Sequence, residues 1–127
     1  MRRVGLLALW LPAVACVLVV TPLGLAADQP VLKPPAAFAQ GEALYNKNCA
    51  ACHGVGAKGT AQGPPFLDKV YEPNHHADIT FYRAPEMGVR AHHWKFGDMP
   101  KIPGITKDDL TQIIPYIRWL QRQAGIF

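Results

Sequence analysis

One short motif constrains this chain more than any other feature of its sequence. Cys49 and Cys52 are three positions apart, and His53 follows the second cysteine directly. On one helical turn, two thiols at this spacing face the same side and can add to the two vinyl groups of a haem, while the adjacent imidazole points at the iron. The spacing is typical of c-type haem attachment, so we expect one covalent haem here.

Other uses of a cysteine pair stay open at this point. A disulfide or half of a zinc site would also need two thiols, but zinc requires further ligands at comparable spacing, and no cysteine follows Cys52. A thioredoxin-like motif is preceded by a strand, whereas the residues around 49–53 favour helix. These arguments favour haem attachment, as does an export signal, because thioether attachment of this kind is completed outside the cytoplasm.

The N-terminal stretch has the pattern of such a signal. Arg2 and Arg3 precede a run over residues 4–26 that contains no charged side chain and ends in small residues. We predict a secretory signal peptide over residues 1–26 and a periplasmic mature protein. The alternative is an uncleaved anchor that holds the domain at the membrane, facing the periplasm, because the run approaches the ~20 residues that span a bilayer.

The charge of the chain excludes one class of partner. The chain has 13 Lys and Arg residues and 9 Asp and Glu residues, and the leader contains two of the basic ones, so the mature protein has a net charge of only +2. No basic run or basic stripe interleaved with aromatic residues is present. The sequence therefore lacks the electrostatic pattern of a nucleic-acid-binding protein.

The rest of the chain reads as one helical domain. Residues 27–35 are rich in proline and predict a linker, followed by a single domain over residues 36–127. A first helix is expected over residues 36–48. A last helix begins with a capping box at Thr106 and Asp109, and contains Pro115, which predicts a kink. The last helix has apolar residues at helical spacing: Leu110, Ile113, Ile114, Ile117 and Leu120.

Several marks along the domain together resemble one family. Gly41 and Tyr45 lie eight and four positions before Cys49, residues 63–66 read Gly-Pro-Pro-Phe, and residues 98–100 read Asp-Met-Pro. The spacing, the Gly-Pro turn and the methionine loop are similar to those of the monohaem class I cytochromes c, and the resemblance extends over nearly the whole domain.

The resemblance implies a fold and a function. The fold is all-α, of the class I cytochrome c type, with N- and C-terminal helices packed crosswise around one covalently attached haem c. Gly41 would let the two helix backbones approach. The implied function is that of a monomeric electron carrier, not an enzyme, with a protein donor and a protein acceptor as transient partners. A haem subunit of a periplasmic dehydrogenase or oxidoreductase complex and a haem-based sensor are the alternatives.

The resemblance also implies the axial ligands of the iron. His53 is the first, and the candidates for the second are Met99, Met87 and the histidine pairs at 75–76 and 92–93. Met99 is the predicted second ligand, because Pro100 and Pro103 stiffen its loop as in the family's Met-Pro motif. Met87 has no such loop, and we expect it to fill a gap in the core. Ligation by histidine and methionine leaves no open iron position, which favours electron transfer over bond making.

Two further residues have candidate roles beside the haem. In the family the proline of the Gly-Pro turn, here Pro64, accepts the second N–H of the ligating histidine. An ordinary turn proline fits the sequence equally well. Trp94 can donate its indole N–H to a haem propionate, or simply pack in the core.

Two histidine pairs, His75-His76 and His92-His93, raise the question of a second metal, because neutral imidazole suits copper. Adjacent residues on a helix or strand point in different directions, so we expect neither pair to supply two ligands to one ion. The alternatives are a solvated, pH-sensitive face, or one histidine per pair bonded to a propionate.

Overall fold

The structure, a computed structural model, describes residues 32–127. The predicted signal peptide over 1–26 and residues 27–31 of the predicted linker lie outside the described residues. Within the described part, no helix combines the length and the apolar character needed to cross a membrane.

The described residues form helices joined by loops, as predicted. The α-helices are α1 (Ala39–Asn48), α2 (Ala50–His53), α3 (Asp78–Met87) and α4 (Lys107–Gln123), with 3-10 turns at Ala36–Phe38, Val55–Ala57 and Lys69–Tyr71. Apart from one antiparallel bridge between Val89 and Met99, this part of the chain contains no β-structure. The all-α prediction is therefore confirmed.

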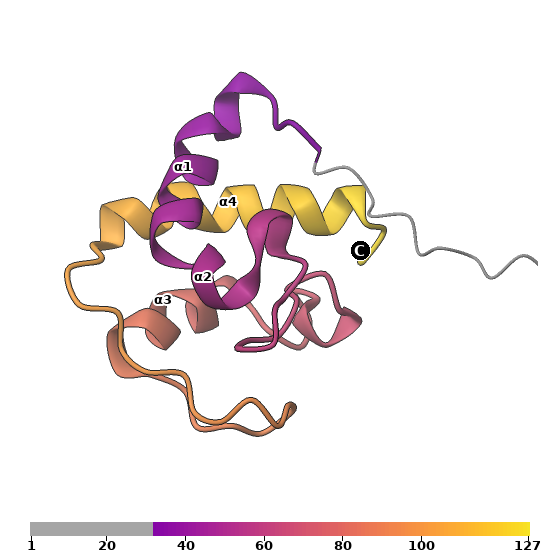
Figure 1. Ribbon diagram of the computed structural model, residues 1–127. Coiled ribbons are helices and arrows are strands. Elements are labelled where there is room, and N and C mark those ends of the chain that lie inside the picture. Colours follow the sequence, from indigo (N-terminus) through magenta and orange to yellow (C-terminus); the bar gives the residue numbers. More distant parts are fainter. Residues whose placement is uncertain (1–31) are drawn as a thin grey trace, which may run out of the picture.

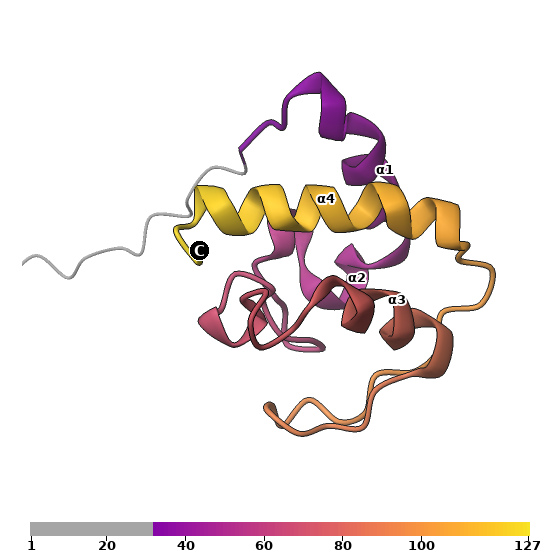
Figure 2. The same ribbon diagram turned by 180° about the vertical axis from the view of Figure 1, so that it is seen from behind.

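Helices α1 and α4 cross each other, and the other elements lie to one side of α4 (Figures 1 and 2). At the crossing, a Cβ on Gly41 would collide with the backbone carbonyl oxygen of Gln112 and come within 2.9 Å of the Tyr116 Cβ. Tyr45 and Tyr116 are completely buried beside it. Gly41 thus allows the close backbone approach that the resemblance implied.

Helix α4 supplies most of the core. Its predicted capping box is present, with the Thr106 side chain accepting from the Asp109 backbone and the Asp109 side chain accepting from Thr106. The helix continues through Pro115, which is exposed, so the proline does not break it. The five apolar positions that sequence periodicity assigned to the core are all buried: Leu110, Ile113, Ile114, Ile117 and Leu120.

A buried arginine, which the sequence analysis did not single out, fastens the segment before α3 to α4. Arg118 donates from Nε to an Asp78 carboxylate oxygen at 2.7 Å, and from its terminal nitrogens to the carbonyls of Tyr71 at 2.8 Å and His76 at 2.5 Å. Gln121, one helical turn away, donates to the Phe66 carbonyl at 2.8 Å. Two polar side chains at core spacing on an apolar helix face were the signal for this network.

Candidate haem site

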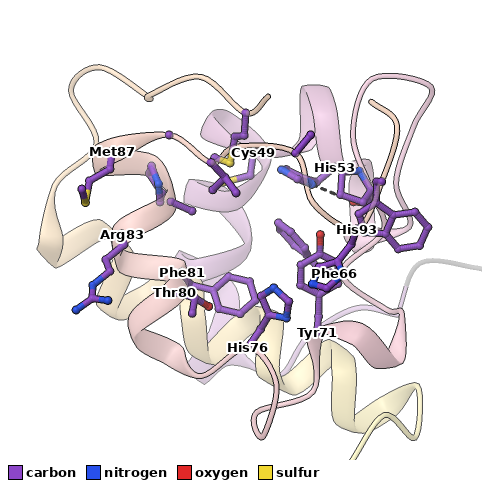
Figure 3. Close-up of a pocket in the computed structure, with 18 of the residues that line it drawn as sticks. Cys49, His53, Phe66, Tyr71, His76, Thr80, Phe81, Arg83, Met87 and His93 are labelled. Carbon is purple, nitrogen blue, oxygen red and sulfur yellow. Dashed lines mark hydrogen bonds between the residues drawn. The ribbon is translucent and has the colours of Figure 1, made fainter. Parts of the chain in front are cut away.

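A cavity of about 390 Å³ lies below the helix crossing and is open at one side. Its walls come from the cysteine motif, the Gly-Pro turn, α3, α4 and the loop over residues 88–105, which we call the methionine loop (Figure 3). The lining is mostly apolar with a few polar groups, which is the usual character of a cofactor site. The sequence elements that resembled a haem protein therefore meet around one space.

His53 ends α2, is buried, and points into this cavity. Its Nδ1 lies 2.9 Å from the Pro64 carbonyl oxygen, an arrangement in which Nδ1–H donates and Nε2 keeps its lone pair. Burial lowers the pKa of the His53 imidazole, against the opposing effect of the bond to Pro64. The ring is also stacked on Phe66, with centroids 4.1 Å apart. His53 is therefore held as a neutral, oriented ligand.

The two cysteines stand at the start and in the middle of the same helical turn. Cys49 is half-buried and lines the cavity, whereas Cys52 is exposed, and both are free thiols. Burial, followed by the neighbouring Cys52, raises the pKa of the Cys49 thiol to about 11. A Cβ on Gly63 would lie 2.9 Å from the Cys52 carbonyl oxygen, so a glycine there lets the Gly-Pro turn pack against the motif.

Met99 is half-buried on the methionine loop and also lines the cavity. Its backbone exchanges two hydrogen bonds with Val89, each 2.9 Å long. Gly88 adopts a left-handed φ of 77°, and a Cβ there would lie 2.8 Å from the Met99 carbonyl oxygen. The turn that ends α3 thus fixes where the Met99 backbone runs.

The expectation that Met87 fills a gap in the core is wrong. Met87 is the last residue of α3, its side chain is 66% exposed, and it stands at the edge of the cavity (Figure 3). Gly88 turns the chain immediately after Met87 and leaves it at the rim of the cavity.

Trp94 carries an unpaired donor at the cavity. Its indole Nε1 is buried and finds no hydrogen-bond acceptor within the described chain. Burial raises the pKa of the Tyr71 phenol and the neighbouring indole opposes that rise, but the two groups do not meet in hydrogen-bond geometry. A buried donor left unpaired costs about 1–3 kcal/mol, so it points to an acceptor on a ligand.

These residues fit a covalently bound haem. The thiols of Cys49 and Cys52 lie on one helical turn with the oriented imidazole of His53. The Met99 thioether lines the same apolar cavity, and the Trp94 N–H has no acceptor in the described chain. Of the six residues that the sequence analysis assigned to the site, Cys52 lies outside the cavity. The other five line it: Cys49, His53, Pro64, Trp94 and Met99. Cys52 is nevertheless one residue before His53 on the same turn.

Comparison with known proteins agrees with this fit. The sequence model of the family described as Cytochrome c matches residues 38–121. A protein of Azospirillum sp. (strain B510), described as "Cbb3-type cytochrome c oxidase subunit CcoP", is 32% identical over 101 residues, which is 70% of this chain. The protein of the same description from Azospirillum brasilense is 32% identical over 100 residues, which is 69% of this chain.

The chain spans only 32% of the length of each of these two relatives. No solved structure matches it at a significant level. Since the family match covers both the cysteine motif and the helix crossing, this chain belongs to the cytochrome c family, whose domain binds haem c covalently.

Proposed function

We propose that this chain carries single electrons through a haem iron held between His53 and Met99, and exchanges them with a protein donor and a protein acceptor in short-lived contacts. The observation that carries the proposal is that His53 and Met99 line the same cavity. Pro64 orients the ring of His53, and Val89 holds the backbone of Met99.

The haem, when bound, supplies an iron that changes reversibly between two oxidation states. The protein's part is to keep the surroundings the same in both states. His53 stays neutral because its ring is buried and its Nδ1–H is already donated to Pro64, so no proton needs to move. Met99 would supply the second protein ligand and leave no position for a substrate, and the mostly apolar lining would favour the haem over water.

Two further assignments are part of the proposal. Cys49 and Cys52 would form the two thioethers, and the Trp94 N–H would donate to a haem propionate, which would satisfy its unpaired donor. Residues 1–26 would act as a signal peptide that exports a domain over residues 36–127 to the periplasm.

A second function is supported by the similarity to the Azospirillum oxidase subunits. The chain could serve as the haem subunit of a stable oxidoreductase complex, passing electrons to or from a catalytic partner. Purification of the untagged protein from its own host under mild conditions distinguishes these two functions. A carrier migrates as a monomer, whereas a subunit elutes with a larger partner in fixed proportion.

The axial ligand is tested by a matched pair of methionine substitutions, Met99→Ala and Met87→Ala, in protein made with a cytochrome c maturation system. Ferric wild type should show the weak near-infrared band of a methionine bound to iron. We expect Met99→Ala to abolish the band and Met87→Ala to retain it, because Met87 is exposed at the rim. In the reduced state, only Met99→Ala should bind carbon monoxide rapidly.

A band that survives in Met99→Ala, or is missing from the wild type, would refute Met99 as the ligand. Rapid binding of carbon monoxide to the reduced wild type would instead favour a haem-based sensor.

A further inference from the structure

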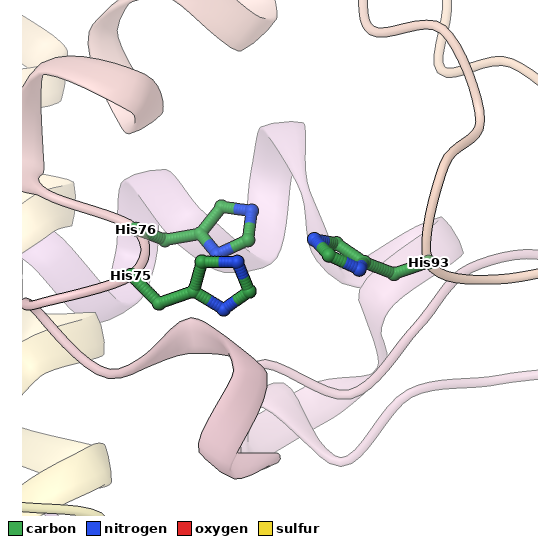
Figure 4. A group of neighbouring side chains, drawn as sticks. All are labelled: His75, His76 and His93. Atoms are coloured by element: carbon green, nitrogen blue, oxygen red, sulfur yellow. The ribbon is translucent and has the colours of Figure 1, made fainter.

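Histidines from two separate segments meet at the mouth of the cavity. His75 and His76 lie in the turn before α3, and His93 lies on the methionine loop (Figure 4). The ring centroids are 4.8 Å apart for His75 and His76, 5.0 Å for His75 and His93, and 5.3 Å for His76 and His93. Neither the cysteine motif nor the Gly-Pro turn involves these three side chains.

The rule that adjacent residues point in different directions holds on a helix or strand, and it does not apply to His75 and His76. His75 and His76 occupy a turn, not a helix or strand, and both backbone N–H groups donate to the Glu72 carbonyl, at 3.0 and 2.8 Å. In this conformation the two side chains leave the chain on the same side, and both face His93 (Figure 4).

The nitrogen atoms are close enough to share an ion. One ligand atom from each of the three histidines lies within 4.8 Å of the others. Zinc binds imidazole nitrogen at about 2.0–2.1 Å, which in a tetrahedral site separates the nitrogens by roughly 3.4 Å. A movement of about an ångström closes the gap, and His93 is on an exposed loop that permits it.

His76 has the surroundings of a metal ligand. Its Nδ1 lies 2.6 Å from the Val70 carbonyl oxygen, so that nitrogen donates and Nε2 is left with its lone pair free. A ligating histidine usually donates its other N–H to a carbonyl in this way. Its backbone carbonyl in turn accepts from the buried Arg118. Val70 therefore orients the ring of His76, and Arg118 fixes its backbone.

The surroundings of His76 and His93 favour the neutral ring, which is the form that binds metal. Burial and the neighbouring His75, His93 and His92 lower the pKa of His76, against the effect of its bond to Val70. Burial, then His92 and His75, lower the pKa of His93.

We propose that His75, His76 and His93 bind one divalent transition-metal ion, Zn(II) or Cu(II), through three imidazole nitrogens, with water completing the coordination. Imidazole is a donor that suits both ions. A bound ion would join the methionine loop to the turn that Arg118 anchors, so it would hold down the loop that carries Met99. None of the three histidines is a haem ligand in the function proposed above, although His76 and His93 also line the haem cavity.

The test is a calorimetric titration of the ferric holoprotein with Zn²⁺, which is redox-inert and leaves the oxidation state of the haem unchanged. We expect one ion per chain, and at least a tenfold loss of affinity in His75→Gln and in His93→Gln. His92→Gln is the matched control, because His92 lies next to His93 on the same loop and its Nδ1 faces the Arg90 carbonyl at 2.8 Å. It should keep the wild-type affinity.

The haem absorption spectrum of each variant verifies that the domain is folded, because these exposed positions should leave it unaltered. Absence of zinc binding in the wild type would overturn the proposal, and is the result expected if a haem propionate already occupies these histidines. An equal loss of affinity in His92→Gln and His93→Gln would also overturn it, because the ion would then bind a diffuse histidine surface instead of the three-residue site.

Discussion

The helix crossing and the methionine loop hold the two sides of the cavity in different ways. At the crossing, four side chains of the hydrophobic core are at most 2% exposed: Tyr45, Ile113, Tyr116 and Ile117. In the methionine loop over residues 88–105, most side chains are exposed. No backbone N–H between residues 92 and 98 donates to a backbone group of the part of the chain that the structure describes.

Only a few bonds attach that loop to the rest of the domain. The Gly88 N–H donates to the Ala84 carbonyl and the Ile102 N–H to the Pro85 carbonyl, both at 2.8 Å. The Val89–Met99 pair and the bond from the Ala91 N–H to the Asp98 carboxylate lie within the loop itself. The histidine side of the haem site is therefore built on the well-packed part of the fold and the methionine side on the lightly held part. Loss or exchange of Met99 need not unfold the domain.

Native-state hydrogen exchange gives the largest expected difference between the two regions. Backbone amides of residues 92–98 should exchange with an opening free energy near zero, because they have no backbone partner. Amides of Ile114 and Ile117 in α4 should exchange only through global unfolding, at about 5–15 kcal/mol. Both are read from one sample by mass spectrometry or NMR. Equal protection in the two regions would contradict the comparison.

Gly41→Ala disrupts the crossing itself. The new Cβ would collide with the Gln112 carbonyl, so α1 and α4 must move apart. We expect a loss of about 1–3 kcal/mol in the free energy of unfolding, even though alanine raises helix propensity by about 1 kcal/mol relative to glycine. Urea unfolding of the holoprotein measures it. Ala43→Ser, exposed on the same helix, is the control and should change little. Unchanged or increased stability of Gly41→Ala would refute the close approach.

Asp109→Asn should produce the smallest effect, because solvent screens a charge at the surface. The Thr106 N–H and the Thr106 hydroxyl donate to the Asp109 carboxylate at 3.0 and 2.8 Å, and these bonds lower the pKa of that carboxyl. A depressed pKa in the folded state stabilises the protein above the unfolded value of about 3.9, and the stabilisation is lost as the pH falls through the folded value.

Wild type should therefore be more stable than Asp109→Asn at pH 7, with the difference shrinking below about pH 4. Urea unfolding at several pH values measures this. Asp108→Asn is the control, because it removes one negative charge at the preceding position, which is not part of the capping box. A difference that persists undiminished in acid would show that the carboxylate charge is not responsible.

Much of the rigid half of the molecule could be predicted from the sequence, because it depends on local patterns. The capping box at Thr106 and the apolar periodicity of α4 are short-range signals, and the structure confirms both. The predicted closeness of His53 and Pro64 came from the family resemblance, and the structure brings the two together at 2.9 Å. Met87 was misjudged because its exposure depends on where the chain turns at Gly88, which residue type alone does not reveal.

The haem motif and the capped, apolar last helix could be derived from the residues alone, because each depends on spacing along one segment. The all-α class and the crossing at Gly41 came from the family resemblance. Which distant groups meet depends on the tertiary structure. The turn before α3 brings His75 and His76 to His93, and a buried Arg118 holds that turn in place. Contacts of this kind depend on how loops return to the same point in space, and neither periodicity nor local spacing encodes that path.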